Sequence, residues 1–208
     1  MKSYLAESQL VTDLLDLLRL RVQPLAHYRY PWWQPALLIT LLGVFAASTA
    51  EFMVAPALAR IAYFVCLNWF ELLLMTHFFH WWMQLGGRWN GEGSLLQLMA
   101  VCQGVQILEP LLTWLPDPVA VSASLLLAGY SIVMLVHALA AATHVARSHV
   151  MGGILLFTPV ALALYLAMMM VANQFGWIAE PPAAAKKSSQ PAVPRPNADS
   201  PAQGKTSF

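Results

Sequence analysis

The sequence predicts an all-α polytopic membrane protein with five transmembrane helices, an amphipathic helix before them and a disordered tail after them. Of the 208 residues, 59% are hydrophobic and 10% are charged, whereas soluble domains have roughly 45–50% and about 25%. The apolar residues form long runs separated by short turns, and most charged residues lie near the two ends of the chain. The net charge is +1, and the 11 Lys and Arg residues are scattered along the chain. We therefore expect no nucleic-acid partner, because such a partner needs a concentrated basic face.

Residues 1–30 are predicted to be a cytoplasmic N-terminal segment containing the amphipathic helix. One helical arc holds the apolar side chains of Leu10, Val11, Leu14, Leu17 and Leu18. The opposite arc holds the polar side chains of Thr12, Asp13, Asp16 and Arg19. These charges interrupt the leucines, so the segment does not resemble a signal peptide. We expect the helix to lie on the membrane surface or to pack on the rest of the chain, and docking to a partner is the alternative.

Residues 31–178 are predicted to form a five-helix transmembrane domain, because about 20 apolar residues cross a bilayer. The first span covers about residues 36–55, with Trp32 and Trp33 in the interfacial region and Glu51 near its far end. The other four run from just after Pro56 to about residue 85, and over about residues 95–115, 119–142 and 151–172. The connections are too short for a soluble domain.

Basic residues near the span ends predict the orientation. A cytoplasmic N-terminus places six of them on the cytoplasmic side: Lys2, Arg19, Arg21, Arg29, Arg88 and Arg147. The opposite turns carry Glu51, Asp117 and a single base, Arg60. Five spans then send the C-terminus to the other side of what we expect to be a bacterial inner membrane. Residues 179–208 are rich in Pro, Ala and Ser and are predicted to be disordered.

The segment GGRWNGEGS, residues 86–94, connects the second and third spans. It contains neither GxxxxGK[ST] nor GxGxxG between a strand and a helix, the patterns that hold nucleotide phosphates. Ser94 and Gln97 instead match the S-x-x-Q capping box of a helix start. Gly91 and Gly93 allow the chain to reverse tightly. We predict a turn followed by a capped helix, and a ligand-binding loop is the alternative.

Several motifs together resemble the bacterial branch of the Yip family, named after Ypt/Rab-GTPase-interacting proteins. They are a His-bearing span that continues into LGGRWNGEGSLLQLMAV, the proline of EPLL, the LPDP turn, and the Gly129–Tyr130 pair of the fourth span. The resemblance covers about residues 30–175 and implies five spans, a cytoplasmic N-terminus, and membrane organisation, trafficking or transport rather than catalysis. Eukaryotic members bind small GTPases through a region with a DLYGP-like segment, which this chain lacks, so small-GTPase binding is doubtful here.

Polar side chains within the spans are the candidate functional residues, because hydrocarbon disfavours them and they normally face the protein interior. The third span carries four on one helical arc: Gln103, Gln106, Glu109 and Thr113. Pro110 follows Glu109 and should disturb the helix, and we expect Glu109 to be buried. Asn68 and Glu71 share one side of the second span. These groups could hydrogen-bond neighbouring helices, or they could form a polar pathway or a proton-exchanging carboxyl.

The histidines form two further patterns. His77 and His80 are one helical turn apart, a spacing that permits joint metal ligation but also arises in aromatic-rich helices. They are weak metal candidates, and we predict no metal and no other cofactor. Tyr130, His137 and His144 recur every seven residues and therefore line one stripe of the fourth span. Packing and snorkelling to headgroups explain such a stripe as readily as function does.

The sequence contains no GxSxG, HExxH or paired-carboxylate arrangement, so we predict a non-enzymatic protein. The first hypothesis is a Yip-like membrane-organising scaffold or accessory subunit, with the lipid bilayer and a membrane protein or a second copy as partners. The alternative is a small transporter or channel that uses Glu109, Glu71 and the histidines. A metal-dependent intramembrane enzyme is a third hypothesis. A water-lined passage to Glu109 would favour transport, whereas a solid core with an exposed apolar flank would favour interaction.

Overall fold

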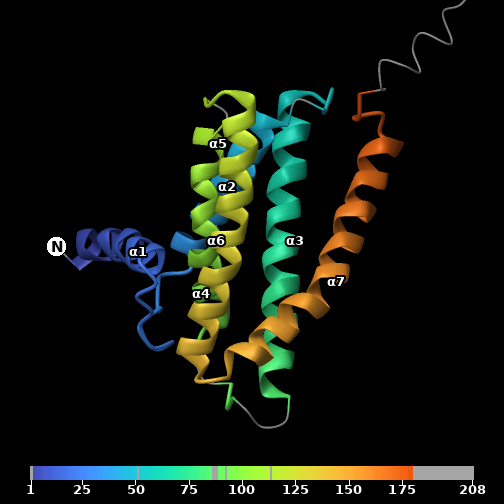
Figure 1. Ribbon diagram of the computed structural model, residues 1–208. Coiled ribbons are helices and arrows are strands. Elements are labelled where there is room, and N and C mark those ends of the chain that lie inside the picture. The colour runs from blue at the N-terminus through green and yellow to red at the C-terminus, as the bar shows by residue number, and fades with distance from the viewer. Residues whose placement is uncertain (1, 51, 86–88, 92, 113, 180–208) are drawn as a thin grey trace, which may run out of the picture. The chain divides into compact units, whose positions relative to one another are not determined.

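The computed structural model describes residues 2–50, 52–85, 89–91, 93–112 and 114–179. The chain divides into two units, residues 1–178 and 179–208, and every named element lies in the first and is a helix (Figure 1). The described residues also contain one isolated antiparallel bridge, between Met53 and Ile178. The predicted disordered tail lies almost entirely outside the described residues.

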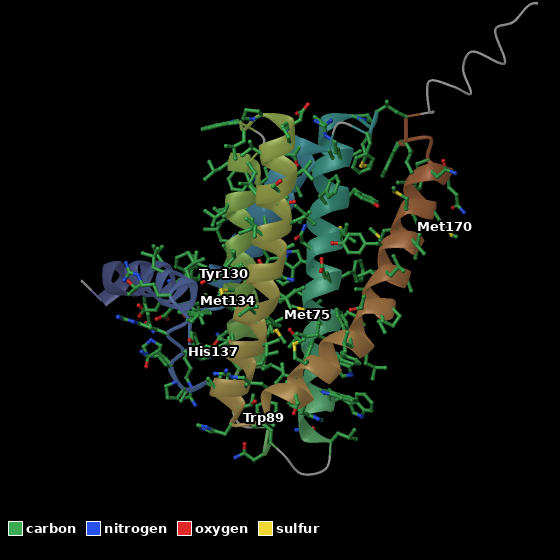
Figure 2. The ribbon with its side chains drawn as sticks, in the orientation of Figure 1. Met75, Trp89, Tyr130, Met134, His137 and Met170 are labelled. Carbon is green, nitrogen blue, oxygen red and sulfur yellow. The ribbon has the colours of Figure 1, made fainter. Side chains whose placement is uncertain are left out.

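Helix α1 (Lys2–Leu18) packs against the other helices through its leucines. Leu17 is fully buried, and Tyr130 of α6 donates a hydrogen bond to the carbonyl of Leu18 at the end of α1. Figure 2 shows Tyr130 and Met134 on the side of α6 that faces α1. The prediction that Asp13 lies on an exposed polar face was wrong, because this residue is only 4% exposed. The chain after α1 turns back and covers this carboxylate with polar partners, which helical periodicity does not reveal.

Four helical segments are long and apolar enough to cross a membrane. They are α3 (Ala57–Gln84), the segment Leu95–Leu112, α6 (Asp117–Thr143) and α7 (Arg147–Gln174). Helix α2 (Trp33–Thr49) is shorter, at 17 residues. At 1.5 Å per residue it spans about 26 Å, against about 30 Å of hydrocarbon. It ends earlier than predicted, and the amide of Val54 beyond it donates to the carbonyl of Trp177 at 2.9 Å.

The segment Leu95–Leu112 changes its helical form before Pro110. Helix α4 (Leu95–Gln103) leads into the 3₁₀ helix η1 (Gly104–Leu108) and then α5 (Glu109–Leu112). A proline has no amide hydrogen to bond the preceding turn, and its ring crowds that turn. The predicted disturbance at Pro110 is therefore observed as a tighter 3₁₀ turn just before it.

Helix α4 lies at the centre of the packing, where it contacts α1, α2, α3 and α6. Its residues 98–101 are fully buried. Helices α2 and α3 approach closely at Gly43, where an added Cβ would lie 2.6 Å from the Cα of Val65. Close approach at small residues is the usual way that membrane helices gain packing energy.

Helix α7 is covered by the rest of the chain mainly near its first residues. Trp82 of α3 stacks on His149 with ring centroids 4.8 Å apart. The Trp82 indole donates to the carbonyl of His149 at 2.9 Å, and the His149 ring lies 3.0 Å from the carbonyl of Trp82. Between Phe157 and Ala172 no residue of α7 is buried. In Figure 1, α7 diverges from α6 after their connection, and Met170 points away from the other helices in Figure 2.

Candidate functional site

A polar cavity of about 220 Å³ lies between the apolar helices α3, α4 and α6. Its walls consist of Glu71, Met75, Cys102, Gln103, Gln106, Ser131, Ile132 and Leu135. Figure 2 marks the place by Met75, between α3 and α6. The structure therefore brings together three predicted residues, Glu71, Gln103 and Gln106, from two spans whose relative placement the sequence left open.

Glu71 stands halfway along the 28-residue helix α3, far from either helix end. The hydroxyl of Tyr165 in α7 donates to its Oε2 atom at 3.0 Å. A carboxyl group within hydrocarbon needs such a donor, because an unpaired polar group there is costly. Sequence reasoning missed Tyr165, because 94 positions separate the two residues and one tyrosine in an apolar helix gives no signal of its partner.

Gln103 is the most buried polar residue of the cavity, with 7% of its surface exposed. Its Oε1 atom is buried and has no hydrogen-bond partner among the described residues. An unsatisfied buried acceptor costs about 1–3 kcal/mol, so this position favours a donor, either water or a bound group. The walls contain no His, Lys or Arg. The cavity thus offers a carboxylate and an amide oxygen to a hydrogen-bond donor.

A smaller cavity of about 30 Å³ has Asn68, Gln106 and Glu109 in its walls. It suffices for one or two waters, since each needs about 10–15 Å³. The side-chain amide of Asn68 donates a hydrogen bond to the carbonyl of Phe64 at 2.9 Å. Glu109, which we expected to be buried, is exposed. It lies in the last short turn before the LPDP connection, where the 3₁₀ segment has altered the helix face that periodicity assigned.

The polar cavity does not continue to the end of the bundle where α6 ends. Leu98 and Met99 of α4 and Leu139 of α6 follow it in that direction, and all three are fully buried. These side chains form a solid apolar core, and the two cavities at that end share no wall residue with the polar one. These packed side chains separate the polar cavity from that end of the bundle.

A second polar cluster lies outside the spans and fastens α1 to the segment after it. The carboxylate of Asp13 lies 3.0 Å from Nε2 of His27 and accepts a hydrogen bond from the hydroxyl of Tyr30. Gln97 of α4 donates to the carbonyl of Tyr30 at 2.8 Å. Burial, together with the hydrogen bond to Asp13, raises the pKa of Tyr30 well above its usual range, and burial raises the pKa of Tyr28 to about 12.

Residues 86–88 and 92 of the predicted glycine turn lie outside the described residues, and the predicted cap after it differs from the observed one. Gly91 and Gly93 adopt φ values of +80° and +97°, which suit glycine. Ser94 occupies the N-cap position of α4, but its side chain makes no capping hydrogen bond. Gln97, the other member of the expected capping box, reaches Tyr30 instead. The tertiary contact with the N-terminal segment has replaced the local one.

The histidines lie apart from the polar cavity. His77 is exposed, and the ring of His80 meets the ring of Trp89 edge-on with centroids 5.3 Å apart. Nδ1 of His137 lies 3.1 Å from a guanidinium nitrogen of Arg147. Within the part of the chain that the structure describes, no three His, Cys, Asp or Glu side chains gather as metal ligands.

Comparisons with protein-family models, with curated proteins and with solved structures gave no match. The resemblance to the Yip family therefore rests on the sequence motifs. Within the described helices, Glu71 accepts a hydrogen bond from Tyr165 and shares the polar cavity with Gln103.

Proposed function

We propose that this chain is a non-enzymatic, Yip-like membrane protein that acts as an accessory subunit or membrane-organising scaffold. It binds a transmembrane segment of a partner along the side where Glu71 of α3 meets Tyr165 of α7. Helix α2 is the fifth span, and α1 lies where the bundle meets the membrane surface. The N-terminus faces the cytoplasm of a bacterial cell, and the tail lies on the opposite side of the inner membrane.

The observation that supports this function is a polar pair beside an uncovered helix face. Tyr165 is 46% exposed and bonded to Glu71, within the stretch of α7 that has no buried residue. Lipid tails cannot hydrogen-bond these groups, whereas a polar side chain of a neighbouring helix can, for about 0.6–2 kcal/mol each. A partner helix on this side would cover both the polar pair and the apolar surface of α7.

The solid core also supports interaction over conduction. A channel needs a continuous polar path, and the fully buried residues Leu98 and Met99 close one side of the polar cavity. The second candidate function, a small proton-coupled transporter, is favoured by the position of Glu71 in a cavity with an unsatisfied amide oxygen. Such a transporter would need the core to open during its cycle.

Site-specific photo-crosslinking in native membranes tests the proposal. A photoreactive residue at Ile132, which lines the polar cavity and is 45% exposed, should give one discrete protein adduct. The same residue at Leu126, on another face of α6 and 75% exposed, is the matched control. Tyr165→Phe should weaken the Ile132 adduct, because it removes the donor. Lipid adducts alone at Ile132, or the same protein at both positions, would contradict the proposal.

Glu71→Gln separates the two candidate functions. The amide keeps a hydrogen-bonding oxygen for Tyr165 but cannot exchange a proton. An accessory subunit should therefore keep its Ile132 adduct and its cellular role. A proton-coupled transporter should insert normally and lose its activity, measured as growth of a strain that depends on this protein.

A further inference from the structure

Two cavities adjoin each other at the end of the bundle where α6 ends and α7 begins. The first, of about 420 Å³, has Arg29, Asn90 and His144 in its walls, with Trp89 beside them. The second, of about 520 Å³, is lined by His137, His144 and Arg147. His144 belongs to both, so the two cavities form one basic region, and Figure 2 shows His137 and Trp89 near this end.

The walls of both cavities contain cationic or titratable basic side chains and no Asp or Glu. Among the described residues, no carboxylate oxygen lies within 4.0 Å of a guanidinium nitrogen of Arg29 or Arg147. The one ion pair between described residues joins His27 to Asp13. Arg147 donates to Nδ1 of His137, which is a neutral acceptor in that contact. The two guanidinium charges are therefore not cancelled by protein anions of the described chain.

The backbone adds to this positive potential. Ala146 and Arg147 line the second cavity and stand at the start of the 28-residue helix α7. The first amides of a helix have no partner within it and favour an anion. His144 follows α6 in the left-handed conformation, with φ at 57°, and thereby stands between the two cavities. Histidine is among the residues that tolerate this conformation.

We propose that this basic region binds the phosphate group of an anionic membrane lipid. The guanidinium groups of Arg29 and Arg147 contact the phosphate oxygens, because the planar fork of arginine matches phosphate geometry. His144 lies between them as a further donor. The cavities open where apolar helices end, at the depth of lipid headgroups, which favours a lipid over a soluble phosphate ester. This site shares no wall residue with the polar cavity beside the proposed partner surface.

The test measures lipid binding by the purified full-length protein in a zwitterionic detergent. The probes are short-chain phosphatidylglycerol, which is anionic, and short-chain phosphatidylcholine, whose choline would meet the guanidinium groups unfavourably. Arg29→Gln and Arg147→Gln should each weaken phosphatidylglycerol binding by roughly tenfold, because each removes a charge-assisted contact. Arg21→Gln removes the same charge from an exposed position outside both cavities and should leave binding unchanged.

Equal losses in Arg21→Gln and Arg29→Gln would overturn the proposal, because general surface charge would then explain the binding. Equal affinity for the two lipids would overturn it as well. Inorganic phosphate that displaces phosphatidylglycerol with the same dependence on Arg29, and binds more tightly than the lipid, would assign the site to a soluble phosphate compound and overturn the lipid proposal. Failure of phosphate to compete would support the lipid. Arg29→Lys keeps the charge but lacks the fork, so it should bind phosphatidylglycerol more weakly than the unaltered protein and more tightly than Arg29→Gln. This variant tests the contact if Arg29→Gln does not fold.

Discussion

Replacement of Gly43 by alanine should loosen the contact between α2 and α3 and lower the stability of the whole bundle. A Cβ at this position would lie 2.6 Å from Cα and 2.8 Å from the amide nitrogen of Val65. Both are backbone atoms, so no change of side-chain rotamer can relieve the clash. The helix axes must separate by about 0.8 Å there to reach the 3.4 Å of ordinary contact.

The size of the effect follows from two opposing contributions. Overpacking of a close helix contact costs about 1–3 kcal/mol, while alanine in place of glycine inside a helix stabilises it by about 0.5–1 kcal/mol. The net destabilisation for Gly43→Ala is therefore between about 0 and 2.5 kcal/mol and centred near about 1 kcal/mol, which corresponds to a fall of about 2–4 °C in Tm. Gly129 of α6 supplies the matched control, because nothing lies within 4 Å of its added Cβ. Gly129→Ala should be neutral or slightly stabilising.

The two cysteines of the chain provide the assay. Cys66 is exposed and Cys102 is buried, so a Cys66→Ala background leaves one thiol that reacts only after unfolding. A fluorogenic maleimide then reports the Tm of each variant in detergent. If Gly43→Ala melts at the same temperature as Gly129→Ala, or above it, the close approach of α2 and α3 is not a stabilising contact and the reasoning fails.

Three further outcomes are expected. Gly153→Ala should lower the Tm by more than Gly152→Ala, because its Cβ would lie 2.7 Å from a tryptophan ring whereas that of Gly152 lies at 3.6 Å; equal melting temperatures would contradict this. The contribution of Tyr28 to the free energy of unfolding should be fully present below about pH 10 and be lost as the pH rises towards 12, because burial raises the folded-state pKa of Tyr28 to about 12 from 10.0. Absorbance at 295 nm during an alkaline titration follows this ionisation. Cysteines placed at Ser3 and Ser207 should be labelled from opposite sides of the membrane, and labelling from one side would mean that α2 does not cross it.

Much of the fold could be predicted from the sequence, because apolar runs of sufficient length become helices in any membrane protein. The boundaries of α3, α6 and α7 depend on local features such as prolines and short polar turns, which the sequence displays directly. The disturbance at Pro110 was predictable for the same reason. Helix α2 ended early because its end depends on contacts with residues near 177, at the far end of the described chain.

The polar partners could not be predicted, because each pair joins residues that are distant in the sequence. Asp13 belonged to a polar helical arc by periodicity, yet His27 and Tyr30 enclose it. Glu71 was singled out from the sequence but its partner Tyr165 was not, and Glu109 was expected to be buried although it is exposed. Periodicity assigns a residue to a face of its own helix and does not reveal what that face meets.

Helix α6 is the structural element that the two proposed sites share. Ser131, Ile132 and Leu135 line the polar cavity beside α3, and the basic cavities begin two residues later with His137 and continue to His144. A continuous helix transmits a displacement along its axis, because its backbone hydrogen bonds resist local stretching. A displacement of α6 along its axis would therefore alter the walls of the polar cavity and of the basic region together.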